Sequence, residues 1–165
     1  MGADKSAEQK PAGAATPAAS TGAAAANNDN DDGIPKLKVV LVGDTAVGKS
    51  CLITNYLHNT FTDNYEPTVL DIYKGQKALN KEQVDVEIHD TSGDKQLAES
   101  RRVQYAGADV FMLCVAVNKR SSFDNIKDWV TEIYSTIANK PIMLVLTKSD
   151  IEEGAEVTLK DLKNR

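Results

Sequence analysis

A phosphate-binding loop motif is the feature that most constrains this sequence. Residues Gly43–Ser50 read G-x-x-x-x-G-K-S, and the apolar run 37–42 comes directly before them. Such a loop forms between a buried strand and a helix, because its glycines let backbone N–H groups turn inward around phosphates. Lys49 would then reach the β- and γ-phosphates of a nucleoside triphosphate, and the Ser50 hydroxyl would bind Mg²⁺. The residues expected to bind phosphate here are Asp44, Thr45, Ala46, Val47, Gly48, Lys49, Ser50 and Cys51.

The first 33 residues differ in composition from the rest of the 165-residue chain. After Met1 they contain no aromatic residue and no aliphatic residue larger than Ala. Such a segment cannot bury enough apolar surface to offset its ordering entropy. We therefore expect a disordered N-terminal tail over 1–33 and one folded domain over 34–165.

The charge of the chain is low. The net charge is −5, and two lysines against five acidic residues give the tail −3, which leaves −2 for the domain. A general nucleic-acid-binding surface needs a clustered basic charge, so we expect no nucleic-acid partner.

Cysteine usage and hydropathy indicate a cytoplasmic protein. Cys51 and Cys114 each lie within an apolar run, so we expect buried, reduced thiols rather than a disulfide. No stretch of 18 apolar residues and no signal-peptide core is present. Met1–Ser6 matches M-G-x-x-x-S, the pattern for N-myristoylation of Gly2. A single acyl chain would give weak, reversible membrane association, and hence a peripheral membrane location.

Five segments predict strands. Near-continuous apolar runs, typical of strands buried on both faces, span 37–42, 109–117 and 142–147. Segments 69–79 and 83–89, joined by Asn80-Lys81-Glu82, predict an antiparallel hairpin.

Helical patterns alternate with these strands. They cover 49–58, 95–106 and 121–138, with Ser121 or Ser122 expected as the N-cap of the third, and a capping box at Thr158 opens another helix. The order predicts a three-layer α/β P-loop domain with a mostly parallel sheet and one antiparallel edge hairpin. The ligand should bind at the carboxyl ends of the strands.

A second motif points to the base of the nucleotide. Thr147-Lys148-Ser149-Asp150 follows the strand 142–147. The Asp150 carboxylate can accept hydrogen bonds from N1–H and N2–H₂ of guanine, a donor pair that adenine lacks. The stem of Lys148 can lie along the base, so Thr147, Lys148 and Asp150 are the expected guanine-binding residues.

The segment after the strand 83–89 is expected to face the phosphates. Asp90 could hold the Mg²⁺ ion through a water, from the side opposite Ser50, and the Gly93 amide could contact the γ-phosphate.

The loop after the first helix supplies a further metal ligand. Pro67 stiffens it, and the Thr68 hydroxyl would complete the Mg²⁺ site with Ser50 and Asp90. Phe61 and Tyr65 are candidates to pack on the guanine rim and on the phosphates, respectively. Both aromatics could equally be packing residues.

Together these motifs resemble the small GTPases of the Ras superfamily, from about Lys36 to Asp150. Four of the five motifs of that family are present: Gly43–Ser50, Thr68, Asp90–Gly93 and Thr147–Asp150. The resemblance implies a switch that binds GTP and GDP with Mg²⁺. In such a switch, loops 60–72 and 91–106 contact effectors, exchange factors and GTPase-activating proteins.

Two subfamilies remain open. Thr45 and the segment Ser121–Trp129 resemble Rab proteins. Tyr65–Val69, Asp109–Phe111 and Thr147 resemble Rho proteins. The chain is therefore expected to be a divergent Rho-like or Rab-like member.

The departures from the family pattern concern hydrolysis. Asp94 stands where the family carries the glutamine that orients the attacking water, and Thr45 replaces a glycine beside it. With Lys49, these are the catalytic candidates, and we expect slow GTP hydrolysis. The alternative is an atypical GTPase that binds nucleotide without hydrolysing it and acts as a scaffold. A P-loop kinase or ATPase is a third reading, against which Thr147–Asp150 argues.

The resemblance also implies segments beyond this sequence. A family member would continue after Arg165 through a last strand, a fifth motif, a final helix and usually a prenylation cysteine. We therefore expect a C-terminally incomplete domain.

Overall fold

The computed structural model describes residues 33–61 and 67–164. Three expectations concern residues outside this part: the disordered tail over 1–33, of which only Gly33 is described, the acylation of Gly2 and the role of Tyr65. The compact unit that contains the phosphate loop runs from Asp32 onward, and the description that follows is of that unit.

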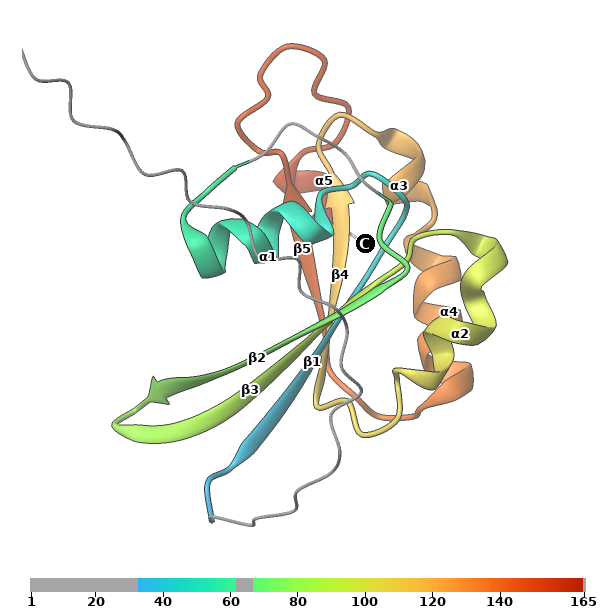
Figure 1. Ribbon diagram of the computed structural model, residues 1–165. Helices are drawn as coiled ribbons and strands as arrows, with labels where there is room; N and C mark the ends of the chain where they lie inside the picture. Colours follow the sequence, from blue (N-terminus) through green and yellow to red (C-terminus); the bar gives the residue numbers. More distant parts are fainter. Residues whose placement is uncertain (1–32, 62–66, 165) are drawn as a thin grey trace, which may run out of the picture. The chain divides into compact units, whose positions relative to one another are not determined.

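One five-stranded sheet forms the middle layer (Figure 1). Its strands are β1 (Lys36–Val42), β2 (Leu70–Leu79), β3 (Glu82–Thr91), β4 (Val110–Ala116) and β5 (Ile142–Thr147). The order across the sheet is β2-β3-β1-β4-β5, and all neighbours are parallel except β2 and β3. The mostly parallel sheet with one antiparallel edge hairpin is therefore confirmed.

The hairpin turn is one residue shorter than expected. Leu79 pairs with Glu82, so only Asn80 and Lys81 form the turn, with φ of 51° and 74°. Positive φ at both central residues is the conformation that matches a two-residue turn to the twist of its strands. This turn sets the register of the whole hairpin, in which Asp71 lies opposite Asp90.

The helices cover both faces of the sheet. They are α1 (Lys49–His58), the short 3₁₀ turn η1 (Lys95–Leu97), α2 (Ala98–Val103), α3 (Arg120–Asp124), α4 (Ile126–Thr136) and α5 (Leu159–Lys163). The capping box at Thr158 is present, with reciprocal bonds to Asp161. None of the described helices has the length and apolar character needed to cross a bilayer.

The single helix expected over 121–138 is two helices. The break falls at Asn125, and the first helix starts after Lys119, so neither Ser121 nor Ser122 is an N-cap. Instead the Ser122 hydroxyl donates to the Lys119 carbonyl at 2.6 Å and accepts from the Ala116 amide at 3.1 Å. The correction has a physical reason: serine bonds the backbone at several places near a helix start, and only tertiary packing selects one.

The alternating side chains of β1 divide the core into two halves. Val40 and Val42 face a cluster to which α3 and α4 contribute Phe123, Trp129 and Ile133. Val39 and Leu41 face the other side, where α1 contributes Ile53. Because the strand period is two, one apolar run supplies both halves.

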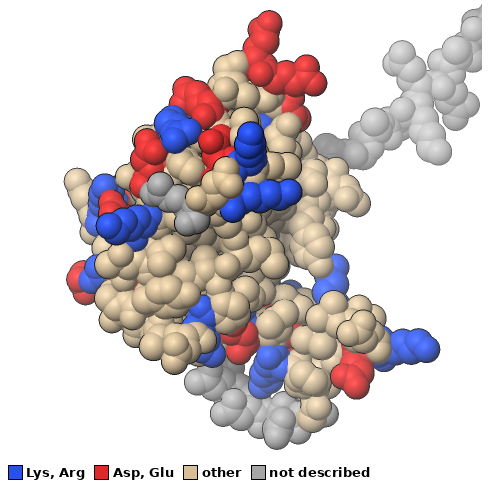
Figure 2. All heavy atoms as spheres, turned by 180° about the vertical axis from the view of Figure 1, so that it is seen from behind, with Lys and Arg blue, Asp and Glu red and all other residues tan. Residues whose placement is uncertain are grey.

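Strand β5 forms an edge of the sheet. Among the described strands it pairs only with β4, and the Met143 side chain on it is 56% exposed. From behind, uncharged residues occupy the middle of the visible face and charged residues gather around it (Figure 2). The apolar run 142–147 predicts a strand that is buried on both faces, whereas β5 is partly exposed.

The two cysteines differ in burial. Both are free thiols, but only Cys114 is buried, and burial raises the pKa of its thiol to about 12. Cys51 is half-buried and borders the cavity described below. The expectation of two buried thiols is thus correct for Cys114 and wrong for Cys51, because helix α1 turns that residue toward the cavity.

Candidate nucleotide-binding site

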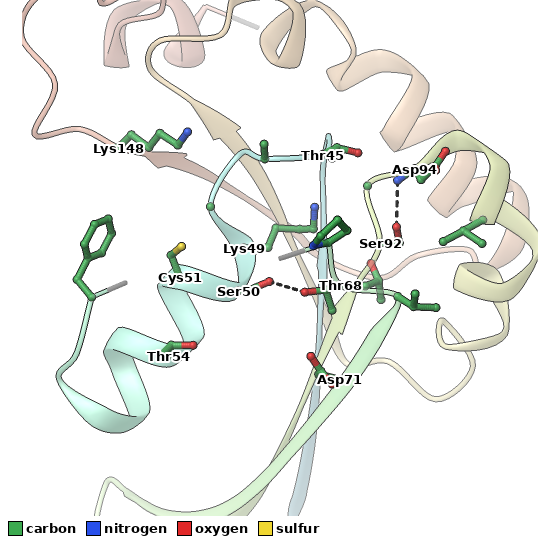
Figure 3. A pocket seen from close by; sticks show the side chains of 18 residues that line it. Thr45, Lys49, Ser50, Cys51, Thr54, Thr68, Asp71, Ser92, Asp94 and Lys148 are labelled. Carbon is green, nitrogen blue, oxygen red and sulfur yellow. Dashed lines mark hydrogen bonds between the residues drawn. The ribbon is translucent and has the colours of Figure 1, made fainter. Parts of the chain in front are cut away.

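A cavity of about 910 Å³ opens where β1 and β3 end, at the carboxyl edge of the sheet (Figure 3). Loops that are far apart in sequence meet around it: the phosphate loop, the segment before β2, the segment after β3 and the segment after β5. Of the expected site residues, those that line it are Thr45, Ala46, Gly48, Lys49, Ser50, Cys51, Phe61, Thr68, Gly93, Asp94 and Lys148. The location agrees with the rule for ligand sites in open α/β sheets.

Glycines are required at the base of the loop. Gly43 has φ of 136°, and a Cβ there would lie 2.4 Å from the Cys114 carbonyl oxygen. A Cβ at Gly93 would lie 2.3 Å from both the carbonyl carbon of Asp44 and the amide nitrogen of Thr45. The segment after β3 thus packs directly on the phosphate loop, which any side chain would prevent.

Lys49 is buried inside the phosphate loop. Its side chain is 7% exposed, and its ammonium donates to the carbonyls of Gly43 at 2.8 Å and Asp44 at 2.9 Å. Burial lowers the pKa of this ammonium to about 8, although the nearby Asp90 charge offsets part of the effect. A cation held this way is placed to meet a phosphate group.

Asp90 is a fully buried carboxylate. It is 0% exposed, and neither of its oxygens has a hydrogen-bond partner among the described residues. Burial raises the pKa of Asp90, and the charge of Asp71 adds to this, while Ser50 and Lys49 offset part of it. An orphaned buried carboxylate is costly unless a cation or a donor satisfies it.

Two hydroxyls lie at the same place. The Ser50 and Thr68 hydroxyl oxygens are 2.9 Å apart, as the dashed line in Figure 3 marks. Hydroxyl and carboxylate oxygens are the hard ligands that Mg²⁺ prefers. The three residues expected to hold Mg²⁺ therefore fit that ion.

Asp94 has a structural role that its sequence position did not predict. Its carboxylate accepts from the Gln96 amide at 2.9 Å and so caps the 3₁₀ turn η1. Its own amide donates to the Ser92 hydroxyl at 3.2 Å. Asp94 lines the cavity, while its carboxylate is engaged with the backbone of η1.

Of the base motif, only Lys148 lines the cavity. Its side chain lies near Gly48, and Phe61 also lines the cavity. Thr147 is buried, and its hydroxyl donates to the carbonyls of Val47 and Val115. Asp150 is exposed and is not among the lining residues. Thr147 thus fastens the phosphate loop to β4, a role that its position in the motif did not suggest.

Three expected residues lie behind the cavity wall. The carboxylate of Asp44 is bound by Asn125 and Trp129, the Val47 side chain is fully buried in the core, and Asp90 lies beneath the lining. For Asp44 and Val47, therefore, only the backbone remains for phosphate contact.

Sequence reasoning missed Asp71, Ser92 and Thr54, which also line the cavity. Asp71 is there because the hairpin register sets it beside Asp90. A two-residue turn at Asn80-Lys81 predicts this pairing, whereas a three-residue connection shifts it. No motif or pattern in the sequence identified Ser92 or Thr54 as site residues.

A lysine-bearing phosphate loop between a buried strand and a helix, at the carboxyl edge of a parallel sheet, defines a P-loop nucleotide-binding domain. A model of the Ras family matches residues 38–164. That match covers more than half of the chain, and the chain belongs to this family.

The relatives are Rho-like. Rho-related protein racE of Dictyostelium discoideum is 38% identical over 128 residues, 77% of this chain and 57% of the relative. GTP-binding protein RHO4 of Saccharomyces cerevisiae is 38% identical over 120 residues, 72% of this chain and 41% of the relative. The chain spans about half the length of these relatives. Of the two subfamilies left open by the sequence, these relatives support the Rho-like one.

Proposed function

We propose that this domain binds GTP and GDP with Mg²⁺ and acts as a small-GTPase switch. The observation that carries the proposal is the pair of buried opposite charges at the end of the phosphate loop. Lys49 and Asp90 are each destabilised by burial, and both lie at the cavity wall or just beneath it. A magnesium-bound triphosphate would supply an anion to the first and a cation to the second.

The roles of the residues follow from the charges they carry. Lys49 would move its hydrogen bonds from the loop carbonyls to the phosphates. Ser50 and Thr68 would bind the Mg²⁺ ion directly, and Asp90 would bind it through a water. The ion would neutralise charge on the phosphates. Loss of the γ-phosphate would release Thr68 and Gly93, and with them the loops 60–72 and 91–106, which would be the surfaces for effectors and regulators.

In the proposed function, selectivity for guanine depends on Asp150. Titration with labelled GTP and ATP tests it: we expect Mg²⁺-dependent GTP binding and little affinity for ATP. Lys49→Ala removes several charge-assisted bonds and should weaken binding by about tenfold or more. Equal binding of GTP and ATP by the unmodified protein would refute the base assignment.

Asp150→Asn is the sharper test of that assignment. The amide can donate to a carbonyl, so the variant should lose affinity for GTP and gain affinity for xanthosine triphosphate, which has a carbonyl where guanine has the amino group. Ser149→Ala, next to it and outside the cavity lining, is the matched control and should bind as the unmodified protein does.

Asp90→Asn tests the metal site. The neutral side chain removes the burial penalty, so the nucleotide-free variant should unfold at a higher temperature at neutral pH. The same variant should lose the Mg²⁺ dependence of nucleotide affinity. A variant that is less stable and still responds fully to Mg²⁺ would contradict the proposed site.

Hydrolysis is expected to be slow, because a carboxylate at Asp94 cannot donate the hydrogen bond by which an amide orients water. The cap that Asp94 makes to Gln96 favours the second candidate function, a nucleotide-bound scaffold. A single-turnover rate indistinguishable from the uncatalysed hydrolysis of GTP would select the scaffold.

A further inference from the structure

Helix α4 presents one row of side chains to two loops of the site. Asn125, which directly precedes α4, is spaced four residues from Trp129, and Trp129 is spaced three residues from Glu132, so the three side chains form one row. Trp129 is the only tryptophan of the sequence and is 5% exposed. None of the three lines the cavity.

The first loop they contact is the phosphate loop. The indole N–H of Trp129 donates to Asp44 Oδ1 at 2.8 Å, and Asn125 Nδ2 donates to Oδ2 at 2.9 Å. Hydrogen bonds to an ionised carboxylate are roughly twice as strong as neutral ones. The second residue of the phosphate loop is therefore anchored to α4, on the side away from the cavity.

The second loop is the segment after β3. The Arg101 guanidinium lies 4.6 Å from the centre of the Trp129 ring and donates to the carbonyls of Ser92 at 2.8 Å and Asp94 at 2.9 Å. Ser92 and Asp94 both line the cavity. The indole N–H of Trp129 thus contacts the phosphate loop. The indole ring contacts Arg101, which binds the segment after β3.

Glu132 fixes the guanidinium in this position. It accepts from Arg101 Nε at 2.9 Å and Nη2 at 2.8 Å, and from the Tyr105 hydroxyl at 2.7 Å. Arg101 is only 3% exposed. Figure 1 shows α2, which carries Arg101, beside α4. A buried, planar, two-point pair of this kind has little freedom to rearrange alone.

We propose that Trp129 and Arg101 are positioning residues that couple the phosphate loop to the segment 92–94, so that the indole senses which nucleotide is bound. The inference rests on the proposed nucleotide function. A γ-phosphate that draws the segment 92–94 toward it must move the two carbonyls that hold Arg101, and the guanidinium then shifts against the indole. A diphosphate, which contacts the phosphate loop alone, leaves that contact unchanged.

Emission from Trp129 tests the coupling without any substitution. Binding is first measured independently, by anisotropy of labelled GDP and of a labelled, non-hydrolysable GTP analogue. Trp129 emission is then recorded at saturation with each unlabelled nucleotide and Mg²⁺. We expect a clear difference between the diphosphate and triphosphate states. Failure to bind either nucleotide refutes the proposed function, whereas binding of both with identical emission refutes the coupling alone.

A double-mutant cycle gives the second test. Trp129→Phe keeps a ring and removes the N–H, and Glu132→Gln frees Arg101 without touching the cavity. Each substitution should reduce the ratio of triphosphate to diphosphate affinity by about threefold to thirtyfold. The double variant should reduce this ratio by no more than the larger of the two single reductions.

Glu99→Gln is the matched control, since Glu99 is 92% exposed in its pair with Arg102 and reaches neither loop. It should leave the ratio unchanged. If the variants weaken the binding of both nucleotides equally, or if the two single reductions of the ratio add up in the double variant, the row has only a structural role and the coupling is overturned. The emission measurement stands if a variant fails to fold.

Discussion

At the scale of single residues, burial sets the chemistry of the site. Lys49 keeps its ammonium in a place where burial lowers its pKa to about 8, and it satisfies the charge with two backbone carbonyls. Asp94, at the edge of the same cavity, uses its carboxylate to cap a turn. Both side chains are therefore already committed to protein partners before any ligand contacts them.

Nucleotide affinity should fall as pH rises above about 8, because the phosphates need the charged form of Lys49 and the free protein loses its proton there. Binding raises this pKa again, so the complex takes up a proton. The loss approaches about tenfold per pH unit. Calorimetric titration in two buffers of different ionisation enthalpy measures the uptake directly. Lys49→Arg keeps its charge at every accessible pH and should abolish the uptake, even if it binds weakly.

Asp94→Gln should hydrolyse GTP faster than the unmodified protein in single-turnover measurements, because the amide can donate to the attacking water. The substitution also removes the cap of η1, at a cost of about 1 kcal/mol. Asp94→Asn separates the two effects, since asparagine keeps capping ability and removes the charge but is shorter. If Gln is no faster than Asp, another group positions the water.

At the scale of elements, α4 links the core to the site. Its apolar side packs Ile126, Trp129 and Ile133 into the larger half of the core. The row formed by Asn125, Trp129 and Glu132 reaches the phosphate loop and α2. Trp129 belongs to both sets, so packing of the helix and geometry of the site are not independent.

Ile133→Ala should lower the free energy of unfolding by about 2–5 kcal/mol, because Ile133 is fully buried and its removal leaves a cavity. Chemical denaturation followed by circular dichroism measures the change. Ser135→Ala, on the exposed side of the same helix, is the control and should change stability by less than about 0.5 kcal/mol. Equal effects of the two substitutions would mean that α4 does not pack as described.

At the scale of the whole molecule, the buried network around Glu132 ties α2 to α4 and makes stability depend on pH. Burial opposes the charge of Glu132, but hydrogen bonds from Arg101 and Tyr105 outweigh it and hold the pKa of this carboxyl below its usual value of 4.5. A lowered carboxyl pKa contributes stability above the unfolded value, and this contribution is lost as pH falls through the folded value.

The free energy of unfolding should therefore decline as the pH falls below about 4.5, and Glu132→Gln should flatten that decline while lowering stability at neutral pH. Denaturant titrations of both proteins between about pH 7 and pH 3 measure the effect. Glu99→Gln, exposed on α2, should leave the acid dependence as it is. If the free energy of unfolding declines equally at low pH in all three proteins, other carboxylates cause the decline.

The order of elements and the phosphate loop followed from the sequence alone. Apolar runs, the alternation of β3 and the glycine spacing of Gly43–Ser50 are local patterns, and local periodicity records which backbone a segment adopts. For the same reason the capping box at Thr158 was predictable, because both of its partners lie within four residues.

Only the tertiary structure decided the rest, because those features depend on pairs of residues far apart in sequence. The hairpin is an exception, since its two-residue turn is local and by itself pairs Asp71 with Asp90. The hydrogen bonds from Asn125 and Trp129 to Asp44 join residues that are 81 and 85 positions apart. The cap that the Asp94 side chain forms is a local contact. The Asp94 carbonyl, however, accepts from Arg101, and Glu132 on another helix fixes the position of Arg101. Local pattern carries no information on such partners, since hydrogen-bond geometry selects them only after the sheet and helices have packed.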